Sequence, residues 1–238
     1  MTRILVISRP RLTVLRFDFA PFQLGGTVVS TLLNDPRQLQ ALGGAVQQAP
    51  YKAAPVYPVL AVKPRNTLVG DGALVTVPAD AEDLELAASL GIVIGRTACR
   101  VPADCALAMV AGYTIAIDIA VPVQGHYRPA LRWRARDGFC PVGPRVTPSS
   151  AVADPDALTV RTWVDGALVQ AASTGGRTRG VARLVADVSD FMTLHPGDLL
   201  LLGGAYPAPR VAAGQSVATE IEGLGRLSLR LVAEEAPA

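Results

Sequence analysis

Cysteine and histidine are scarce in this sequence. Among 238 residues there are three cysteines, Cys99, Cys105 and Cys140, and two histidines, His126 and His195. An odd number of cysteines without a C-x-x-C pair argues against a disulfide framework and against a structural zinc site. Two histidines are also too few for a histidine-rich metal centre. The sequence therefore excludes the metal sites that depend on several soft or nitrogen ligands.

Common nucleotide-binding and nucleophile motifs are absent as well. There is no G-x-G-x-x-G turn, Walker-type Gly-Lys-Ser/Thr or nucleophile elbow. The 22 basic and 20 acidic residues leave a formal charge of +2, which is too small to indicate a nucleic-acid partner. Cys105–Val123 carries only one charge but is interrupted by Gly112 and Pro122, so we expect a buried helix and strand rather than a membrane span. Without a signal-like N-terminus, the expectation is a globular cytoplasmic protein with no membrane partner.

Lysine is nearly missing. Of the 22 basic residues, 20 are arginines, and only Lys52 and Lys63 are lysines. An ammonium is a compact charge with a tunable pKa, whereas a guanidinium is a rigid fork that stays protonated. We therefore treat the two remaining lysines as candidate functional residues.

Glycine and proline, in contrast, are frequent, with 22 and 19 residues. This composition is typical of a strand-rich fold with many turns. Apolar periodicity predicts helices over 36–48, with Asp35 as the N-cap, over 103–113 and over 181–194. Strands are predicted over 26–35, 58–62, 90–96, 113–123, 158–164, 167–170 and 199–204, with hairpins over 68–78 and 216–232. The expected organisation is one α+β domain that is mostly β.

Asp118 is the most informative single residue. It lies inside an apolar run, and a buried carboxylate has to be neutral, paired with a cation or bound to a metal. One interpretation is a salt bridge to one of the many arginines. The other is a ligand for a hard cation such as Mg²⁺, which prefers oxygen donors. One carboxylate does not decide between them.

Arg132, Arg134 and Arg136 follow one another at a spacing of two residues. On an extended strand, all three side chains would project from the same face. They form either a solvated edge strand that resists edge pairing or a clamp for a small molecule with several carboxylates. Lys63 and Arg65, with the same spacing, are candidates to converge on the same anion.

Seven segments follow one another along the chain in a characteristic order. They are Lys63–Pro78, Leu90–Arg96, Val110–Pro122, Arg136–Pro144, Val164–Thr174, Phe191–Gly204 and Ala213–Leu227. Each segment alone is modest evidence, but the ordered set is specific, and it resembles the fumarylacetoacetate hydrolase family over about residues 25 to 232. The resemblance implies a β-roll with few short helices spanning 25–238, preceded by an N-terminal extension over 1–24.

The resemblance also implies an activity. The segments around Lys52 and Tyr127 are similar to a branch of the family that isomerises and decarboxylates unsaturated 2-oxo di- or tricarboxylates in 4-hydroxyphenylacetate (homoprotocatechuate) degradation. The implied cofactor is Mg²⁺. The implied partners are a small polycarboxylate substrate and either a second copy of the chain or a homologous active subunit. This chain would correspond to one half or one subunit of such an enzyme.

Family positions can be assigned residue by residue. The resemblance implies that Asp118 is a metal ligand, and it assigns no residue the role of the general base. The positions that it implies for substrate binding are Lys63, Arg65, Arg134, Asp137, Gln170 and Thr174.

The chain departs from the family where the other metal ligands are expected. Aligned without a gap, the two family glutamates fall on Ala87 and Ser89, and Gly204 replaces a family threonine. An alternative register places Asp83 and Glu85 there, but it shifts the carboxylates by roughly 13 Å along a strand. Three hypotheses follow: a subunit of an active isomerase/decarboxylase, a metal-deficient, inactive structural partner of an active homologue, or a stand-alone binding module for small carboxylates.

Overall fold

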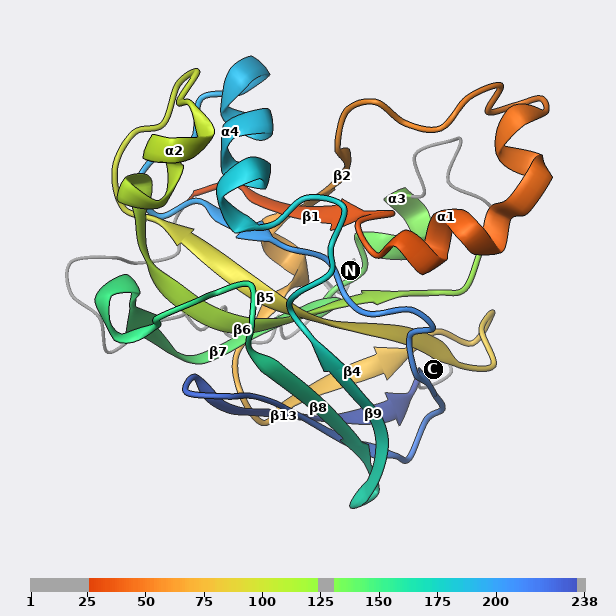
Figure 1. The fold of residues 1–238 in the computed structure, drawn as a ribbon. Helices are drawn as coiled ribbons and strands as arrows, with labels where there is room; N and C mark the ends of the chain where they lie inside the picture. Colours follow the sequence, from red (N-terminus) through yellow and green to blue (C-terminus); the bar gives the residue numbers. More distant parts are fainter. Residues whose placement is uncertain (1–25, 124–130, 235–238) are drawn as a thin grey trace, which may run out of the picture.

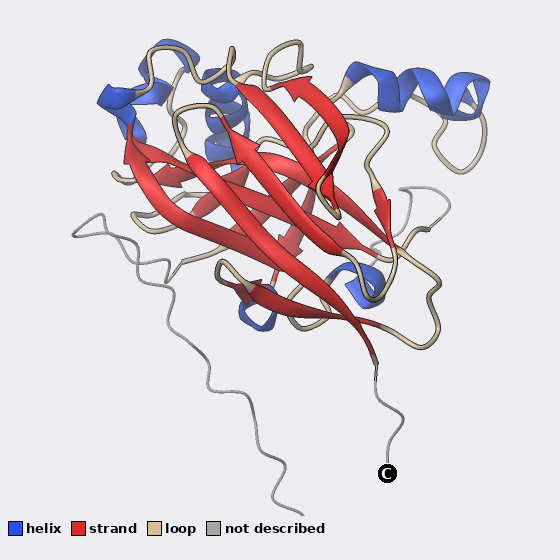
Figure 2. Cartoon of the chain, turned by 90° about the horizontal axis from the view of Figure 1, so that it is seen from below, coloured by secondary structure: helices blue, strands red, loops and turns tan. Residues whose placement is uncertain are grey.

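The computed structural model describes residues 26–123 and 131–234. The expected N-terminal extension over 1–24 and His126 lie outside these residues. Strands dominate the described chain, which confirms the predicted α+β fold that is mostly β, with few short helices. Two curled sheets lie against each other, with the helices at their periphery (Figure 1, Figure 2). In the part that the structure describes, no helix is both long enough and apolar enough to cross a membrane.

The larger sheet carries the most buried part of the chain. Its strand order is β2-β1-β10-β5-β6-β7-β3, and β11 also pairs with β5. The strands are β1 (Val28–Leu32), β2 (Val59–Lys63), β3 (Leu68–Val69), β5 (Leu84–Ile94), β6 (Val110–Ala120), β7 (Cys140–Pro148), β10 (Leu199–Leu201) and β11 (Arg210–Val211). The antiparallel pair β5 and β6 lies at the centre, and Asp118 on β6 is therefore inside the sheet rather than at an edge.

The smaller sheet has the order β4-β13-β12-β8-β9. Its strands are β4 (Ala73–Val77), β8 (Thr159–Val164), β9 (Ala167–Ser173), β12 (Ser216–Ile221) and β13 (Gly225–Ala233). The predicted hairpins β8–β9 and β12–β13 are both present. Asp165 and Gly166 join β8 to β9 with φ of 50° and 83°, the left-handed pair that a tight hairpin requires. One apolar cluster contains side chains from both sheets and forms the core.

Helices are short and cover the outside of the larger sheet. They are α1 (Pro36–Leu42), α2 (Ala103–Ala106), α3 (Leu131–Arg134) and α4 (Val181–Phe191), with 3₁₀ turns at η1 (Gly43–Gln47), η2 (Arg65–Thr67), η3 (Leu107–Met109) and η4 (Ser149–Ala151). The predicted N-cap is confirmed, since the Asp35 carboxylate accepts a hydrogen bond from the Arg37 backbone N–H at 3.0 Å. Figure 1 shows α2 and α4 together at one end of the sheet and α1 at the other.

The predicted helix over 103–113 is wrong beyond its first turn. Only Ala103–Ala106 is α-helical, η3 follows, and β6 begins at Val110. The residues from Val110 onward pair with β5, beginning at the Ile94–Val110 pair. Sheet pairing therefore outweighs the helical preference of this alanine-rich segment.

The predicted hairpin over 68–78 is also wrong. The two strands on either side of the glycine turn pair with different neighbours: β3 lies parallel to β7, and β4 lies parallel to β13. The turn itself is anchored to β13, because Gly72 N–H donates to the Ser228 carbonyl at 2.8 Å and Ser228 N–H donates to Asp71 at 2.6 Å. The segment therefore connects the two sheets.

The arginines at 132, 134 and 136 do not lie on a strand. Leu131–Arg134 is the helical turn α3, closed by a 2.8 Å hydrogen bond from Ala135 N–H to the Leu131 carbonyl. On a helix, residues two apart point to opposite sides, whereas residues four apart share a face. Arg132 and Arg136 accordingly share an ion pair with Asp80 and flank Trp133, and Arg134 turns to Asp118. The strand that both interpretations assumed is therefore wrong, and the three arginines do not form one clamp.

Candidate functional site

A cavity of about 360 Å³ lies where β1, β5, β6 and α3 meet the segment that follows β10. Small residues make part of its wall, including Ala87, Ala120, Gly204 and Ala205. Its charged lining residues come from four elements and are Glu85 (β5), Asp118 (β6), Arg134 (α3) and Arg210 (β11). The structure therefore brings together Asp118 and Arg134, two of the residues that the sequence singled out.

The Asp118 carboxylate forms ion pairs with two cationic side chains. Its Oδ1 is 2.5 Å from Lys63 Nζ, and its Oδ2 is 3.0 Å from Arg134 Nη1. The Ser30 hydroxyl also donates to Oδ2, at 2.6 Å. The Asp118 side chain is only 3% exposed, so these contacts take the place of water. The sequence-based interpretation of a salt bridge to an arginine is thus confirmed, with Lys63 as a second partner.

Lys63 is completely buried, with a side-chain exposure of 0%. Its ammonium donates hydrogen bonds to the carbonyls of Ile119, Arg134 and Phe139 at 3.0, 2.9 and 3.0 Å. A lysine has three N–H donors and tolerates burial only when they are satisfied and its charge is paired. The ammonium joins the end of β6, α3 and the start of β7, and it does not line the cavity.

Asp118 is ionised in this environment. Burial alone would raise its pKa, but the charges of Lys63 and Arg134, with the hydrogen bonds from Lys63 and Ser30, hold the pKa of Asp118 below its usual range. The three charged groups together carry one net positive charge, since two cations share one carboxylate. The site is therefore cationic at its base.

The two family glutamate positions lie next to Asp118. Ala87 is paired directly with Asp118 across β5 and β6, and Ser89 is paired with Ala116. A Cβ atom on Gly204 would lie 2.7 Å from the Cβ of Ala87, so the segment after β10 is packed directly onto Ala87. Ser89 is 1% exposed, and its hydroxyl accepts from Gly203 N–H at 2.9 Å and donates to the Leu90 carbonyl at 3.1 Å. Neither position supplies an anionic ligand.

These residues do not fit a divalent cation. Mg²⁺ and Mn²⁺ sites need several oxygen donors, usually with more than one carboxylate. Asp118 is the only carboxylate at the family ligand positions, and both of its oxygens contact cationic side chains. Within residues 26–123 and 131–234, no group of three or more Asp, Glu, His or Cys side chains is arranged to hold a metal ion.

Glu85 and Arg210 enter the cavity although the sequence analysis did not favour them. Glu85 is two residues before Ala87 on the same face of β5, and Arg210 on β11 is its cross-strand partner. Burial raises the pKa of Glu85, and the charges of Arg134 and Arg210 oppose this effect only in part. Arg210 pairs with Asp83 at 2.6 Å, so the two acidic residues of the alternative register lie in different settings. The two acidic residues around the first residue of β5, Asp83 and Glu85, were the only sequence signal for Glu85.

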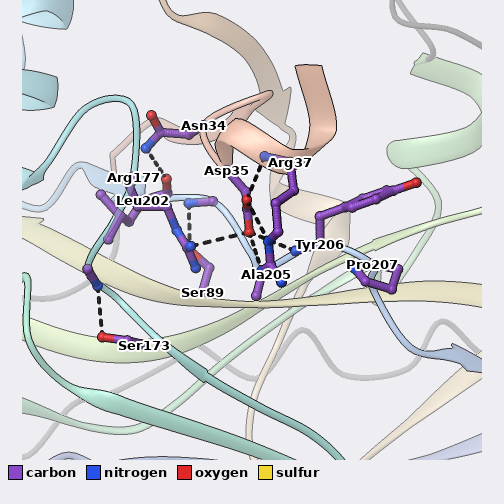
Figure 3. Close-up of polar contacts among 12 residues, drawn as sticks. Asn34, Asp35, Arg37, Ser89, Ser173, Arg177, Leu202, Ala205, Tyr206 and Pro207 are labelled. Atoms are coloured by element: carbon purple, nitrogen blue, oxygen red, sulfur yellow. Dashed lines mark hydrogen bonds and ion pairs between the residues drawn. The ribbon is translucent and has the colours of Figure 1, made fainter. Parts of the chain in front are cut away.

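The cavity wall after β10 is held by Asp35 (Figure 3). Its carboxylate accepts from Tyr206 N–H at 2.9 Å and pairs with Arg37 at 2.6 Å and Arg177 at 3.5 Å. Gln170, a predicted site residue, donates to the Pro207 carbonyl at 2.6 Å and thus supports this wall from β9. Burial would raise the pKa of Asp35, but hydrogen bonds from Arg37 and Tyr206 lower it to about 2.

The remaining predicted residues are not brought to the cavity. Arg65 is exposed in η2, and Asp137 is exposed and accepts from Asn66 at 2.7 Å. Thr174 is buried and its hydroxyl accepts from Leu158 N–H at 2.9 Å. None of the three is among the residues that line the cavity. Their part in substrate binding stays a prediction.

Comparison with known proteins identifies the family to which this fold belongs. The chain is 36% identical over 209 residues to the 4-hydroxyphenylacetate degradation bifunctional isomerase/decarboxylase of Escherichia coli, covering 88% of this chain and 48% of that protein. It therefore spans about half the length of that enzyme.

Solved structures show the same relationship. The 5-carboxymethyl-2-hydroxymuconate delta-isomerase of Mycobacterium smegmatis has a TM-score of 0.76 at 31% identity, over 90% of this chain and 81% of that one. The fumarylpyruvate hydrolase of Pseudomonas aeruginosa, solved with Mn²⁺ and pyruvate, shares the fold with a TM-score of 0.77 at 23% identity, over 96% and 99% of the two chains. The family model described as fumarylacetoacetate (FAA) hydrolase, C-terminal, matches residues 27–232. This chain belongs to the fumarylacetoacetate hydrolase family.

Proposed function

We propose that this chain is a metal-deficient subunit of an isomerase/decarboxylase that acts on unsaturated 2-oxo di- or tricarboxylates in 4-hydroxyphenylacetate degradation. In this proposal its own cavity does not hold the Mg²⁺ expected for the family, and the metal-dependent step takes place at another site. That site belongs to a homologous subunit that carries the family's metal ligands, in a cytoplasmic dimer or larger heteromer, because a second copy of this chain would lack the same ligands. The partial coverage of the E. coli enzyme supports a role as one half of such an assembly.

The state of Asp118 is the observation that carries the proposal. Loss of CO₂ from a carbon β, or vinylogously β, to the oxo group of a 2-oxo acid leaves an enolate, which a bound divalent cation would stabilise as a Lewis acid. In this chain Asp118, at the position that the family resemblance implies for the aspartate ligand, is paired with Lys63 and Arg134 instead, and Ala87 lies opposite it on β5. These contacts support a cavity in which two cationic side chains, rather than a metal ion, balance the charge of Asp118.

A second candidate is a catalytically inactive structural partner of an active homologue. Ala87 and Ser89 favour it, because the two glutamates that a working metal site would need are both missing from β5. The two candidates differ in whether this chain's cavity takes part in substrate turnover.

Metal titration tests the proposal directly. Calorimetry of the purified chain with Mg²⁺ and Mn²⁺ is expected to show no stoichiometric binding. The variant Ala87→Glu/Ser89→Glu, which supplies carboxylates beside Asp118, is expected to gain measurable Mg²⁺ affinity. Stoichiometric binding by the unmodified chain would refute the metal-deficient assignment.

Activity measurements separate the two candidates. The chain alone is expected not to decarboxylate a 2-oxo tricarboxylate with Mg²⁺ present, but to raise the turnover of a mixture with a homologous active subunit. If a cavity variant such as Arg134→Met supports the same turnover in the mixture as the unmodified chain, the inactive structural partner is the correct function.

A further inference from the structure

We propose that the cavity binds a small carboxylate, such as a 2-oxo acid, directly through the guanidinium of Arg134 and without a divalent cation. The inference deepens the proposed function, because it names the ligand class and the anchoring residue of the metal-deficient cavity. It differs from binding through a metal, in which the cation would form the bond to the ligand carboxylate.

The charge at the base of the cavity supports anion binding. Lys63 and Arg134 are both within 3.0 Å of the single Asp118 carboxylate, so these three groups carry one net positive charge, which only Glu85 among the other cavity residues opposes. Lys63 is inaccessible, since its side chain is 0% exposed and its donors face three carbonyls and Asp118. Arg134 is 12% exposed and lines the cavity. The surplus charge is therefore available to a ligand only through Arg134.

Arg134 also has free donors. A guanidinium carries five N–H groups in a fork that matches a carboxylate. Within residues 26–123 and 131–234, its only hydrogen bond runs from Nη1 to Asp118 at 3.0 Å. This bond holds one end of the guanidinium at Asp118, so a ligand would meet a group whose position is already restricted. Such preorganisation lowers the entropic cost of binding.

The size of the cavity limits the ligand. At about 360 Å³ it is near the lower end of the range of roughly 300–1,000 Å³ found for small-molecule sites. Ala87 and Gly204 both line the cavity, but they are packed against each other and leave no room for a further side chain between them. These dimensions suit a carboxylate of a few carbon atoms rather than a nucleotide or a peptide.

The Glu85 carboxylate would repel an anion bound in the cavity. It faces the same cavity as Arg134, Asp118 and Arg210, and Asp83 lies two residues before it on the chain. Arg210 is already paired with Asp83, so it offsets Glu85 less than its charge suggests. Anion binding should therefore be tighter in Glu85→Gln, which removes this negative charge from the cavity.

Oxalate titration of the full chain in the presence of EDTA tests the inference. Oxalate is a small rigid dicarboxylate, and EDTA removes any contribution of a metal. We expect calorimetry to show binding that Arg134→Met weakens at least roughly tenfold, because it removes a charge-assisted hydrogen-bonding group. Arg134→Lys keeps the charge but loses the fork, so its affinity should fall between the two. Glu85→Gln should bind oxalate more tightly than the unmodified chain at pH 8.

Arg132→Met is the matched control. Arg132 lies on the same helical turn as Arg134, but it is 73% exposed and pairs with Asp80. This variant should bind oxalate like the unmodified chain. Thermal melting of each variant shows whether it is folded, and Glu85→Gln tests the inference even if Arg134→Met does not fold.

The outcomes distinguish this inference from the proposed function. No oxalate binding with or without Mg²⁺ overturns the inference and leaves a metal-deficient subunit in place. Oxalate binding that requires added Mg²⁺ overturns both. Equal losses in Arg132→Met and Arg134→Met would show nonspecific attraction of the anion and would also overturn the inference.

Discussion

At the scale of single residues, the identity of Lys63 has a physical explanation. Its ammonium contacts four acceptors, three carbonyls and the Asp118 carboxylate, around one point. A guanidinium is larger and planar, so it does not satisfy four acceptors that converge on one atom. This geometry accounts for a lysine in a chain whose basic residues are almost all arginine.

Lys63→Met tests this explanation through stability. The substitution leaves Asp118 with less compensation in a buried position, and we expect the free energy of unfolding to fall by about 3–5 kcal/mol. Lys52→Met, at the other and exposed lysine, should change it by less than about 0.5 kcal/mol. The double variant Lys63→Met/Asp118→Asn should recover part of the loss. Urea unfolding of the four proteins measures these differences, and equal losses at both lysines would contradict the prediction.

Thr31 is a second residue whose effect on the free energy of unfolding can be tested. It is 3% exposed, and its hydroxyl has no hydrogen-bond partner in the described structure. Thr31→Val removes this unsatisfied group and should stabilise the chain by about 1 kcal/mol. Thr67 is equally buried, but its hydroxyl donates to the Pro64 carbonyl at 2.7 Å, so Thr67→Val should destabilise by a similar amount. Changes of the same sign at the two sites in thermal melting would refute the prediction.

At the scale of elements, the segment after β10 is packed against β5. The close approach of Gly204 to Ala87 leaves no room for a side chain at 204. Gly204→Ala should therefore destabilise the chain by about 1–3 kcal/mol. Adding Ala87→Gly should restore part of the loss, because it removes the nearest atom. Gly44→Ala, where a Cβ meets nothing within 4 Å, is the control and should be nearly neutral in the same urea unfolding measurement.

Asp35 joins the same segment to α1 and makes it sensitive to acid. Its pKa is about 2 in the folded chain and about 3.9 in an unfolded one, so the carboxylate stabilises the fold above roughly pH 4. This stabilisation is lost as the pH falls from 4 through 2. Arg37 is 55% exposed and solvent screens part of the interaction, so we expect about 1–2 kcal/mol.

Asp35→Asn should abolish that contribution at neutral pH. The difference in unfolding free energy between Asp35→Asn and the unmodified chain should shrink steadily below pH 4. Asp190→Asn, at an exposed position on α4, provides the comparison. A difference that persists unchanged down to pH 2 would show that the hydrogen bonds stabilise the fold independently of the charge.

At the scale of the whole molecule, the fold should be independent of divalent cations. A cation that binds the folded state raises the melting temperature by mass action. Because side chains already balance the charge of Asp118, neither EDTA nor about 10 mM Mg²⁺ should move the melting temperature by more than about 1 °C. A rise of several degrees with Mg²⁺, measured by calorimetry, would indicate a metal site and contradict the metal-deficient proposal.

Much of this fold could be predicted from the sequence. The period of two in 216–232 and the Asp165-Gly166 turn identified two hairpins, and the apolar spacing with Asp35 identified α1. The order of the family segments also placed Ala87 and Ser89 at the positions of the missing glutamates. These signals depend on residues close together in the chain, where periodicity, turn chemistry and capping act.

The tertiary structure decided the rest. It turned Arg134 toward Asp118 on a helical turn, buried Lys63, brought Glu85 to the cavity and gave β3 and β4 different partners. Each of these depends on contacts between residues distant in sequence, whose free energies of burial and ion pairing exceed local preferences. The sequence by itself predicted Ala87 and Ser89 at the positions of the family's metal-binding glutamates, with the register through Asp83 and Glu85 as the alternative. Only the packing of β2, β6 and α3 decided that two cationic side chains contact the remaining aspartate.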